Sequence, residues 1–199
     1  MKKFLINARY YLAPLLIFAS LFGVIAGGPW VWTGVFLLGV GIIVDTITPD
    51  QTMGAGFDDN GDTNGNPTLL NITMYAMLAV FVMIQIAICW RIFQYVNGIE
   101  YTGATASFLG MTYYTGITGA QLVGAVVSSG IFAGIGIIYG HELAHTKGFS
   151  FLIARWMMGL SGSAHFCYAH VYNHHLELGC ENDPATAPRG RSLYAHLPK

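Results

Sequence analysis

The chain contains long stretches without any charged side chain, and these stretches constrain its fold more than any other feature. No Asp, Glu, Lys or Arg occurs between Arg9 and Asp45, and two further uncharged runs cover residues 63–90 and 101–140. A helix needs about 20 apolar residues to cross a bilayer, so the runs predict four membrane spans. We expect these spans at Tyr10–Ala26, Trp30–Thr48, Leu69–Trp90 and Gly116–Tyr139. The sequence therefore predicts an all-α fold, a polytopic membrane helical bundle of about four transmembrane helices.

Residues between and within these spans give three further expectations. Gly27-Gly28-Pro29 separates the first two spans and predicts a tight hairpin. We expect residues 102–112 to form a loop or a partly inserted segment. The fourth span carries glycines at four-residue spacing, which would let a neighbouring helix approach closely; these are Gly130, Gly134, Gly136 and Gly140.

The composition excludes several classes of protein. Only 10% of the 199 residues are charged, whereas a soluble domain carries about 25%. The formal net charge is −1 and no basic cluster occurs, so nothing favours a nucleic-acid partner. The three cysteines form no CxxC pair, which argues against a disulfide framework and against a zinc ribbon.

Basic residues predict the orientation of the chain in the membrane. Lys2, Lys3 and Arg9 precede the first span and favour a cytoplasmic N-terminus. Four crossings would then return the chain to the cytoplasmic side, where further basic residues agree with this orientation: Lys147, Arg155, Arg189 and Arg191. We therefore expect one membrane domain, in which residues 1–140 form the transmembrane helices and residues 141–199 a cytoplasmic-side histidine-rich region.

The end of the fourth predicted span carries a motif typical of metal sites. The string GHELAH places His141 and His145 four residues apart, and on a helix this spacing puts both imidazoles on one face. The string is also the HExxH motif of zinc proteases, in which Glu142 would be the general base. Two interpretations follow, a zinc protease or a larger metal site.

A second histidine cluster favours the larger site. The stretch HFCYAHVYNHHLELG repeats the four-residue spacing with His170 and His174, and His175 follows directly. At about 100° per residue of an α-helix, His175 would point away from His174, so these ligands could serve more than one metal. Five histidines exceed what one tetrahedral zinc accepts, and several neutral imidazoles fit iron at an open site as well as zinc.

These residues resemble a known family, the integral-membrane, histidine-rich non-haem di-iron monooxygenases, in particular the AlkB-type alkane monooxygenases. GHELAHTK is similar to the first histidine box of that family, and HFCYAHVYNHHLELGCENDPATAPRGRSLY is similar to the second. The resemblance is specific from Gly140 to Tyr194 and weak before it. Ala169 and Asn173 depart from the family pattern, and both are similar to the xylene monooxygenase hydroxylases.

The resemblance implies a multi-pass protein of the bacterial inner (cytoplasmic) membrane with a catalytic centre of two non-haem iron ions. It identifies five ligands, namely His141, His145, His170, His174 and His175. Family members contain two further spans and two further histidine boxes that this sequence lacks. We therefore expect the chain to be an N-terminal portion of a longer enzyme, inactive by itself.

The activity implied is O2-dependent hydroxylation of the terminal carbon of medium- or long-chain n-alkanes, with electrons from a rubredoxin or a ferredoxin–reductase chain. As a further hypothesis, Glu142 and Asp183 would accept hydrogen bonds from imidazole N–H groups and so orient the ligands, and His165 would lie outside the ligand shell. Residues that could line a substrate channel are Trp32, Phe36, Leu37 and Asp45. Asp183 could equally be a turn residue before Pro184.

Several other functions stay open at this point. Alkyl side chains of aromatic compounds are an alternative substrate, as in the xylene monooxygenases. A membrane zinc metalloprotease would need the HExxH motif with little contribution from the second cluster. A metal-storing or metal-transporting membrane protein would bind metal without consuming reductant, and an acyl-chain desaturase or hydroxylase would share the histidine boxes and differ in substrate.

Overall fold

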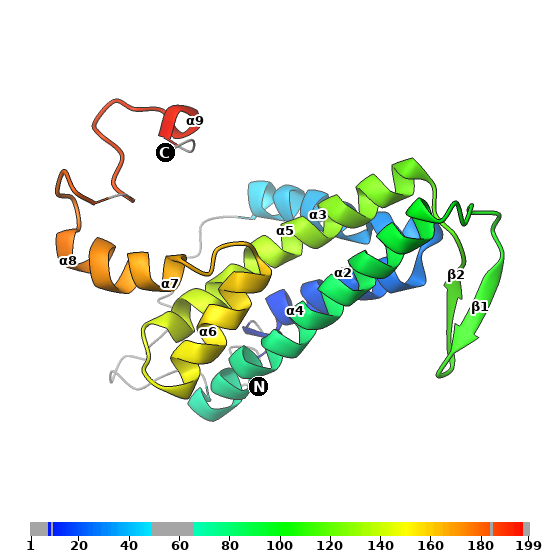
Figure 1. The fold of residues 1–199 in the computed structure, drawn as a ribbon, viewed down its shortest axis with the longest axis horizontal. Helices are drawn as coiled ribbons and strands as arrows, with labels where there is room; N and C mark the ends of the chain where they lie inside the picture. The colour runs from blue at the N-terminus through cyan, green and yellow to red at the C-terminus, as the bar shows by residue number, and fades with distance from the viewer. Residues whose placement is uncertain (1–7, 9, 49–65, 184, 197–199) are drawn as a thin grey trace. The chain divides into compact units, whose positions relative to one another are not determined.

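The computed structural model describes residues 8, 10–48, 66–183 and 185–196, and these are mostly helical, with one β-hairpin and an irregular stretch after α8 (Figure 1). The expectation based on Lys2, Lys3 and Arg9 lies outside these residues. The elements are α2 (Leu12–Ala26), the 3-10 helix η1 (Gly28–Trp32), α3 (Thr33–Ile47), α4 (Pro67–Val96), β1 (Thr105–Phe108), β2 (Met111–Tyr114), α5 (Gly119–Ala144), α6 (Phe149–Leu160), α7 (Phe166–Ala169), the π-helix η2 (His170–His174), α8 (His175–Glu177) and α9 (Leu193–His196).

The chain divides into two compact units, Met1–Tyr139 and Gly140–Lys199. The first contains the long apolar helices and the hairpin, and the second contains the histidine clusters. Helix α5 runs from the first unit into the second, so the peptide chain is continuous and helical at the boundary.

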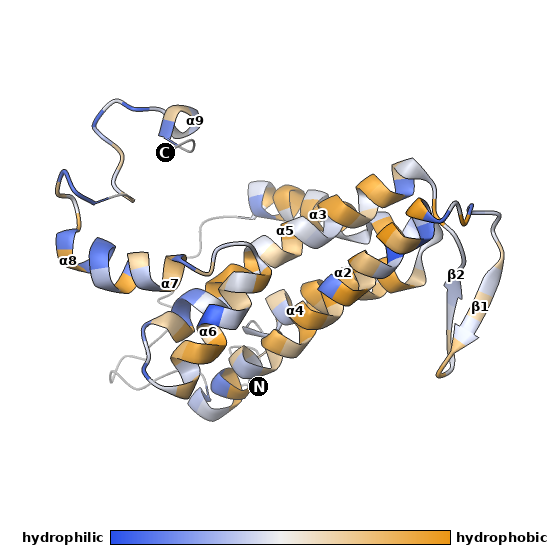
Figure 2. Ribbon diagram, viewed as in Figure 1, coloured by the Kyte–Doolittle hydropathy of each residue, from blue (hydrophilic) through white to orange (hydrophobic). Residues whose placement is uncertain are grey.

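Among the described residues, three helical segments are long and apolar enough to cross a membrane: Gly28–Ile47 with 20 residues, Pro67–Val96 with 30 and Gly119–Ala144 with 26. Figure 2 shows that hydrophobic residues predominate along these helices. Much of that surface is exposed; in α3 only Gly34 is buried, while Phe36 is 69% exposed and Ile47 75%. Apolar helices with exposed large side chains suit lipid, and the predicted class of an all-α membrane bundle is confirmed.

The first predicted span differs from the other three. It is represented by α2, which has 15 residues and therefore falls short of the length that a bilayer requires. The predicted break is present, because Gly27 ends α2 in a left-handed conformation (φ 75°) and Pro29 stands in the first turn of η1. Helix α2 then packs against α3 and α4.

Residues 102–112 form most of a regular β-hairpin, where the sequence predicted a loop or a partly inserted segment. Strands β1 and β2 pair antiparallel, with Thr105 opposite Tyr114 and Phe108 opposite Met111. Thr and Tyr favour strands, and Leu109-Gly110 makes the two-residue turn with φ values of 49° and 79°. The prediction of an irregular loop was wrong, because the uncharged composition of this segment gave no weight to its local preference for strands. The alternative of a partly inserted segment stays a prediction.

The close helix crossings lie at small residues, although not mainly at those predicted. A Cβ on Gly34 of α3 would lie 2.6 Å from the Cβ of Ser128 on α5. The Ser128 hydroxyl donates to the Val31 carbonyl at 2.7 Å, and the Ser20 hydroxyl donates to the Ser128 carbonyl at 3.3 Å. Of the predicted glycines, Gly136 packs against the Phe81 ring so closely that a Cβ would collide with it, whereas a Cβ at Gly130 would have no neighbour within 4 Å.

One buried cation joins α2, α4 and the hairpin. The Arg91 side chain is fully buried. Its Nε donates to the Val24 carbonyl at 2.9 Å and its Nη2 to the Ile25 carbonyl at 2.7 Å, which are unpaired carbonyls at the C-terminal end of α2. Its Nη1 donates to Gln94 Oε1 at 2.7 Å and to the Tyr114 carbonyl at 3.1 Å. The sequence placed Arg91 just beyond the third span, but α4 continues past it to Val96.

We predict that Arg91→Lys destabilises the first unit by about 2–3 kcal/mol, since an ammonium cannot reproduce the planar fork of donors and leaves buried carbonyls unpaired. Thermal unfolding of the purified protein in detergent, followed by circular dichroism, measures the effect. Arg189→Lys is the matched control, because Arg189 is exposed. Equal unfolding temperatures for the two variants would contradict this role of Arg91.

Candidate metal centre

The first histidine pair lies where α5 ends. His141 is in the last turn of α5 and His145 follows directly after it, with 5.1 Å between the ring centroids. Helix α5 extends five residues beyond the predicted end of the fourth span at Tyr139. This extension carries His141 on a regular helix, so the helix fixes the direction of its imidazole.

The second cluster lies on a helix that changes its winding. Residues His170–His174 form a π-helix between the α-helical turns α7 and α8. The backbone N–H of His175 donates to the His170 carbonyl, five residues earlier, as the π-helix requires. Residues five apart therefore face each other in this turn, instead of residues four apart.

The π-turn brings His170 next to His175, with only 3.0 Å between their Nε2 atoms. The sequence analysis assumed an α-helix, in which His170 would face His174; that winding was wrong, because the π-turn brings His175 closest to His170. The ring centroids of His170 and His174 are 5.4 Å apart, compared with 4.4 Å for His170 and His175. Single π-turns inside α-helices are frequently found at functional sites.

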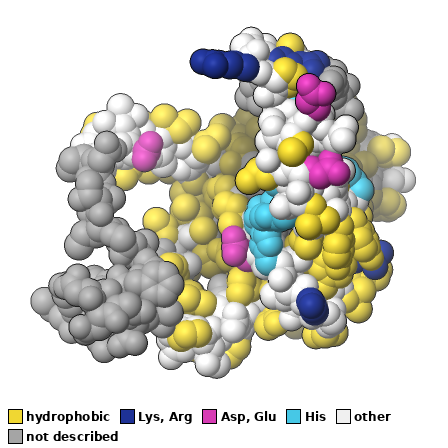
Figure 3. All heavy atoms as spheres, turned by 90° about the vertical axis from the view of Figure 1, so that its left-hand side faces the viewer, with side chains coloured by type: hydrophobic (Ala, Val, Ile, Leu, Met, Phe, Trp, Pro, Cys, Tyr) yellow, Lys and Arg dark blue, Asp and Glu magenta, His cyan; other side chains and the backbone are white. Residues whose placement is uncertain are grey.

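Both clusters meet within the second unit. One ring nitrogen each from His141, His145 and His170 lie within 4.8 Å of one another, which is close enough to share one metal ion. The ring centroids of His141 and His170 are 4.2 Å apart, and His175 lies 4.9 Å from His145. Figure 3 shows a patch of histidine side chains on the surface turned to the viewer. Four imidazoles from two chain segments thus converge.

His170 is the innermost of these residues, with 9% of its surface exposed. Phe166 stacks on its ring at a centroid distance of 4.8 Å and an angle of 12°. Burial, together with the nearby His141 and His175, lowers the pKa of His170 to about 4. Its imidazole is therefore neutral near pH 7 and has a nitrogen lone pair for a metal.

His174 points instead to a buried carboxylate. Its Nδ1 lies 2.8 Å and 3.0 Å from the two oxygens of Asp183. An ionised carboxylate only accepts hydrogen bonds, so Nδ1 carries the proton and Nε2 has the free lone pair. A carboxylate partner of this kind is what metal-binding imidazoles usually have on their second nitrogen.

Asp183 also organises the loop after α8. Its carboxylate accepts from the backbone N–H groups of Gly179 at 3.3 Å and Ala185 at 2.9 Å, and from the Thr186 hydroxyl. Burial by itself would raise the pKa of Asp183, but these bonds and the bond from His174 outweigh it and hold that pKa well below its usual value. Asp183 therefore has both of the roles considered for it, because its carboxylate bonds to the His174 imidazole and to the backbone of the turn around it.

The remaining candidate residues fall into two groups, two in the second unit and four in the first. Glu142 and His165 are exposed, and neither has a hydrogen bond to an imidazole in the described part of the chain. The proposed channel residues belong to the first unit: Trp32 and Phe36 are exposed, Leu37 is half-buried and Asp45 is exposed. These channel residues stay predictions.

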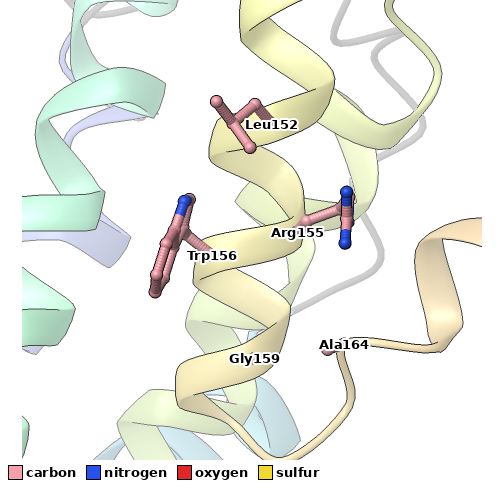
Figure 4. Close-up of a pocket in the computed structure, with 5 residues that line it drawn as sticks. All are labelled: Leu152, Arg155, Trp156, Gly159 and Ala164. Atoms are coloured by element: carbon pink, nitrogen blue, oxygen red, sulfur yellow. The ribbon is translucent and has the colours of Figure 1, made fainter.

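Sequence reasoning missed the residues that support the π-turn. Arg155 of α6 lies over the Tyr168 ring at 5.2 Å, and Phe151 packs edge-on against the same ring with 5.3 Å between centroids. A separate cavity of about 260 Å³ runs along α6, lined by Leu152, Arg155, Trp156, Gly159 and Ala164 (Figure 4). The spacing of Phe151 and Arg155 on one helix face was the available signal.

We predict that Asp183→Asn loosens the loop that follows α8. The NH2 group of Asn would face N–H and O–H donors, and it cannot accept the hydrogen bonds that the carboxylate accepts from them. Hydrogen–deuterium exchange should become faster at the amides of Gly179 and Ala185, while exchange in α6 stays unchanged. Glu181→Gln, at an exposed position, is the control. Unchanged exchange at Gly179 in the Asp183→Asn variant would contradict the proposed network.

Comparison with known proteins gives one family model and several curated relatives that match part of the chain. Residues 118–199 match the family model for fatty acid desaturases. Alkane 1-monooxygenase of Pseudomonas putida is 33% identical over 75 residues, and alkane 1-monooxygenase 1 of Alcanivorax borkumensis is 33% identical over 75 residues. Alkane 1-monooxygenase of Ectopseudomonas oleovorans is 36% identical over 74 residues.

These matches cover 36–37% of this chain and 18–19% of each relative, so the chain matches about a fifth of the length of the curated relatives. No solved structure matches the chain significantly. Residues 118–199, which contain all five clustered histidines, match the fatty acid desaturase family model, and the chain is similar to alkane 1-monooxygenases over 74–75 residues.

Proposed function

We propose that this chain forms part of the di-iron centre of a membrane alkane monooxygenase. The proposed reaction is the O2-dependent hydroxylation of the terminal carbon of a medium- or long-chain n-alkane. The observation that supports it best is the convergence of four imidazoles at the end of an apolar helix, within a domain similar to proteins named alkane 1-monooxygenase.

The donor set fits iron. The cluster offers imidazole nitrogens. The thiol of Cys167, which lies between the two histidine segments in the sequence, is fully buried, and burial raises the pKa of that thiol and disfavours the thiolate. We assign His141, His145, His170 and His175 to one metal position, since their rings converge. His174, oriented by Asp183, is assigned to a second position.

Five imidazoles are fewer ligands than two iron ions with open positions require. The proposal therefore includes further ligands from outside this cluster, and we expect these five histidines alone to support no turnover. Bound iron would supply the reduction of O2, in which one oxygen atom enters the C–H bond and the other leaves as water. The chain's own residues bind and orient: Asp183 holds the His174 tautomer, and Phe166 covers one face of His170.

Substrate and electrons would reach the site from different sides. An alkane partitions into lipid, and the exposed apolar side chains of α3 are suited to meet it there. We propose Trp32, Phe36, Leu37 and Asp45 as residues of the entry route. The histidines would lie on the cytoplasmic face of the inner membrane, where a rubredoxin or a ferredoxin–reductase pair can supply electrons.

We predict that the purified chain binds Co(II), a spectroscopic substitute for Fe(II), and that His→Ala changes at His141, His145, His170 or His175 weaken binding at least tenfold. Titration followed by the visible d–d bands measures affinity and coordination number together. His196→Ala is the control, because His196 makes no ring contact with the cluster in the described part of the chain. Unchanged Co(II) affinity after His170→Ala and His175→Ala would contradict the proposed metal centre.

The same titration separates the proposal from the zinc protease. A protease built on HExxH needs Glu142 for peptide cleavage and depends little on the second cluster. We expect Glu142→Gln to leave the Co(II) spectrum and affinity within about twofold, because the Glu142 carboxylate is exposed and makes no bond to an imidazole among the described residues. For Asp183→Asn we expect a loss of roughly 10–100-fold at the position served by His174.

The substrate class is tested by product analysis. In membranes that contain the protein with its full ligand set, a donor chain, NADH and O2, n-octane should yield 1-octanol. Toluene yielding benzyl alcohol faster would favour the xylene monooxygenase alternative that Ala169 and Asn173 suggest. A double bond in an acyl chain without alkane oxidation would identify a desaturase instead, and metal binding without NADH consumption a storage or transport protein.

A further inference from the structure

The β1–β2 hairpin ends in an apolar tip that no part of the described chain covers. Leu109 is 90% exposed and Phe108 is 66% exposed. Leu109 adopts φ 49°, a conformation that turns usually give to Gly, Asn or Asp. Exposing a large apolar side chain to water at the tip of a strained turn is unfavourable, whereas contact with an apolar phase would stabilise it.

The two faces of the hairpin differ in chemistry. Side chains at paired positions share a face, so the register puts Thr105, Ser107, Thr112 and Tyr114 on one face and Ala106, Phe108, Met111 and Tyr113 on the other. The first face carries hydroxyl groups, and the Ser107 and Thr112 hydroxyls bond to each other at 3.3 Å. The second face is mainly apolar. Figure 2 shows the hydrophobic tip beyond the paler strands.

Contacts with α4 fix the depth at which the hairpin lies. Tyr113, on the apolar face, packs edge-on against Trp90 of α4 with 5.2 Å between ring centroids. The Tyr114 carbonyl accepts a hydrogen bond from Arg91, one residue further along the helix. Trp and Tyr are enriched at the level where a membrane meets water. The base of the hairpin therefore packs against the last turns of α4, a helix long and apolar enough to span a membrane.

Two further facts place the hairpin at the boundary and not inside the hydrocarbon. A two-stranded hairpin has unpaired N–H and C=O groups along both edges, which hydrocarbon cannot satisfy. Strand edges exposed to water usually carry charged side chains that block aggregation, yet residues 101–140 carry none. The hairpin thus needs water on one side and an apolar phase on the other.

We propose that the hairpin is a membrane-interface anchor whose tip, Phe108, Leu109 and Met111, inserts at the acyl-chain boundary of a phospholipid bilayer. The hydroxyl face of Thr105, Ser107 and Thr112 turns to the headgroups and water. Through the Arg91–Tyr114 bond the anchor fixes the height of α4 in the bilayer. This inference depends on the apolar helices of the first unit and is independent of the metal chemistry.

Nitroxide labels at single cysteines test the proposal in the full chain. The parent protein carries Cys89→Ala and Cys180→Ser, and it keeps Cys167, which is 0% exposed and unreactive in the folded state. Leu109→Cys and the matched control Ser107→Cys are labelled and placed in phosphatidylcholine nanodiscs. Power saturation then compares collisions with O2, which concentrates in lipid, with collisions of a water-soluble nickel chelate.

The proposal predicts a several-fold excess of O2 collisions at position 109 and an excess of nickel collisions at position 107. Nickel excess at both positions would mean that the tip lies in water and would overturn the anchor. Low collision rates for both reagents at position 109 would show that protein covers the tip; spin–spin broadening would then identify a second copy of the chain. Only variants that elute like the parent in size-exclusion chromatography are compared, so misfolding does not enter the result.

Discussion

The first unit depends on how the carbonyl groups at the C-terminal end of α2 are satisfied. These groups lie among buried residues of the protein, where water does not satisfy them, so protein donors must reach them. Arg91 provides the donors from α4 and also holds the Tyr114 carbonyl of the hairpin. One guanidinium thereby fixes the short helix, a long span and the hairpin in one arrangement. Gly27 permits this arrangement because a Cβ at that position would collide with Arg91.

The second unit depends on a change in helical winding. A regular α-helix would pair His170 with His174, whereas the π-turn pairs His170 with His175 and leaves His174 for Asp183. The Tyr168 ring packs against Phe151 and Arg155 of α6, and these contacts hold α7, which leads into the π-turn, against α6. The five histidines therefore divide into a convergent group of four and one imidazole with its own carboxylate, which is the division that the proposed function uses.

Particular residues illustrate how far sequence reasoning reached. Absence of charge predicted the long apolar helices, because transfer of a charge into lipid is costly whatever the packing around it. The charge pattern placed Arg91 just outside the third predicted span. In the structure α4 continues beyond Arg91 to Val96, and the Arg91 side chain is buried. Sequence reasoning missed the hairpin at 105–114 because an uncharged run of Thr, Ser and Tyr is compatible with a loop, a strand or a membrane edge. It grouped the histidines by residue type and could not foresee the π-turn.

The sequence by itself determined that the chain is a helical membrane protein and which imidazoles are available as ligands, since both follow from residue type and local spacing. Tertiary structure alone decided which of those imidazoles converge, which one Asp183 orients, and where α2 and the hairpin attach to α4. The reason is physical: hydropathy and helical period are local properties, whereas the π-turn, the Asp183 network and the Arg91 bonds depend on groups from separate segments meeting in space.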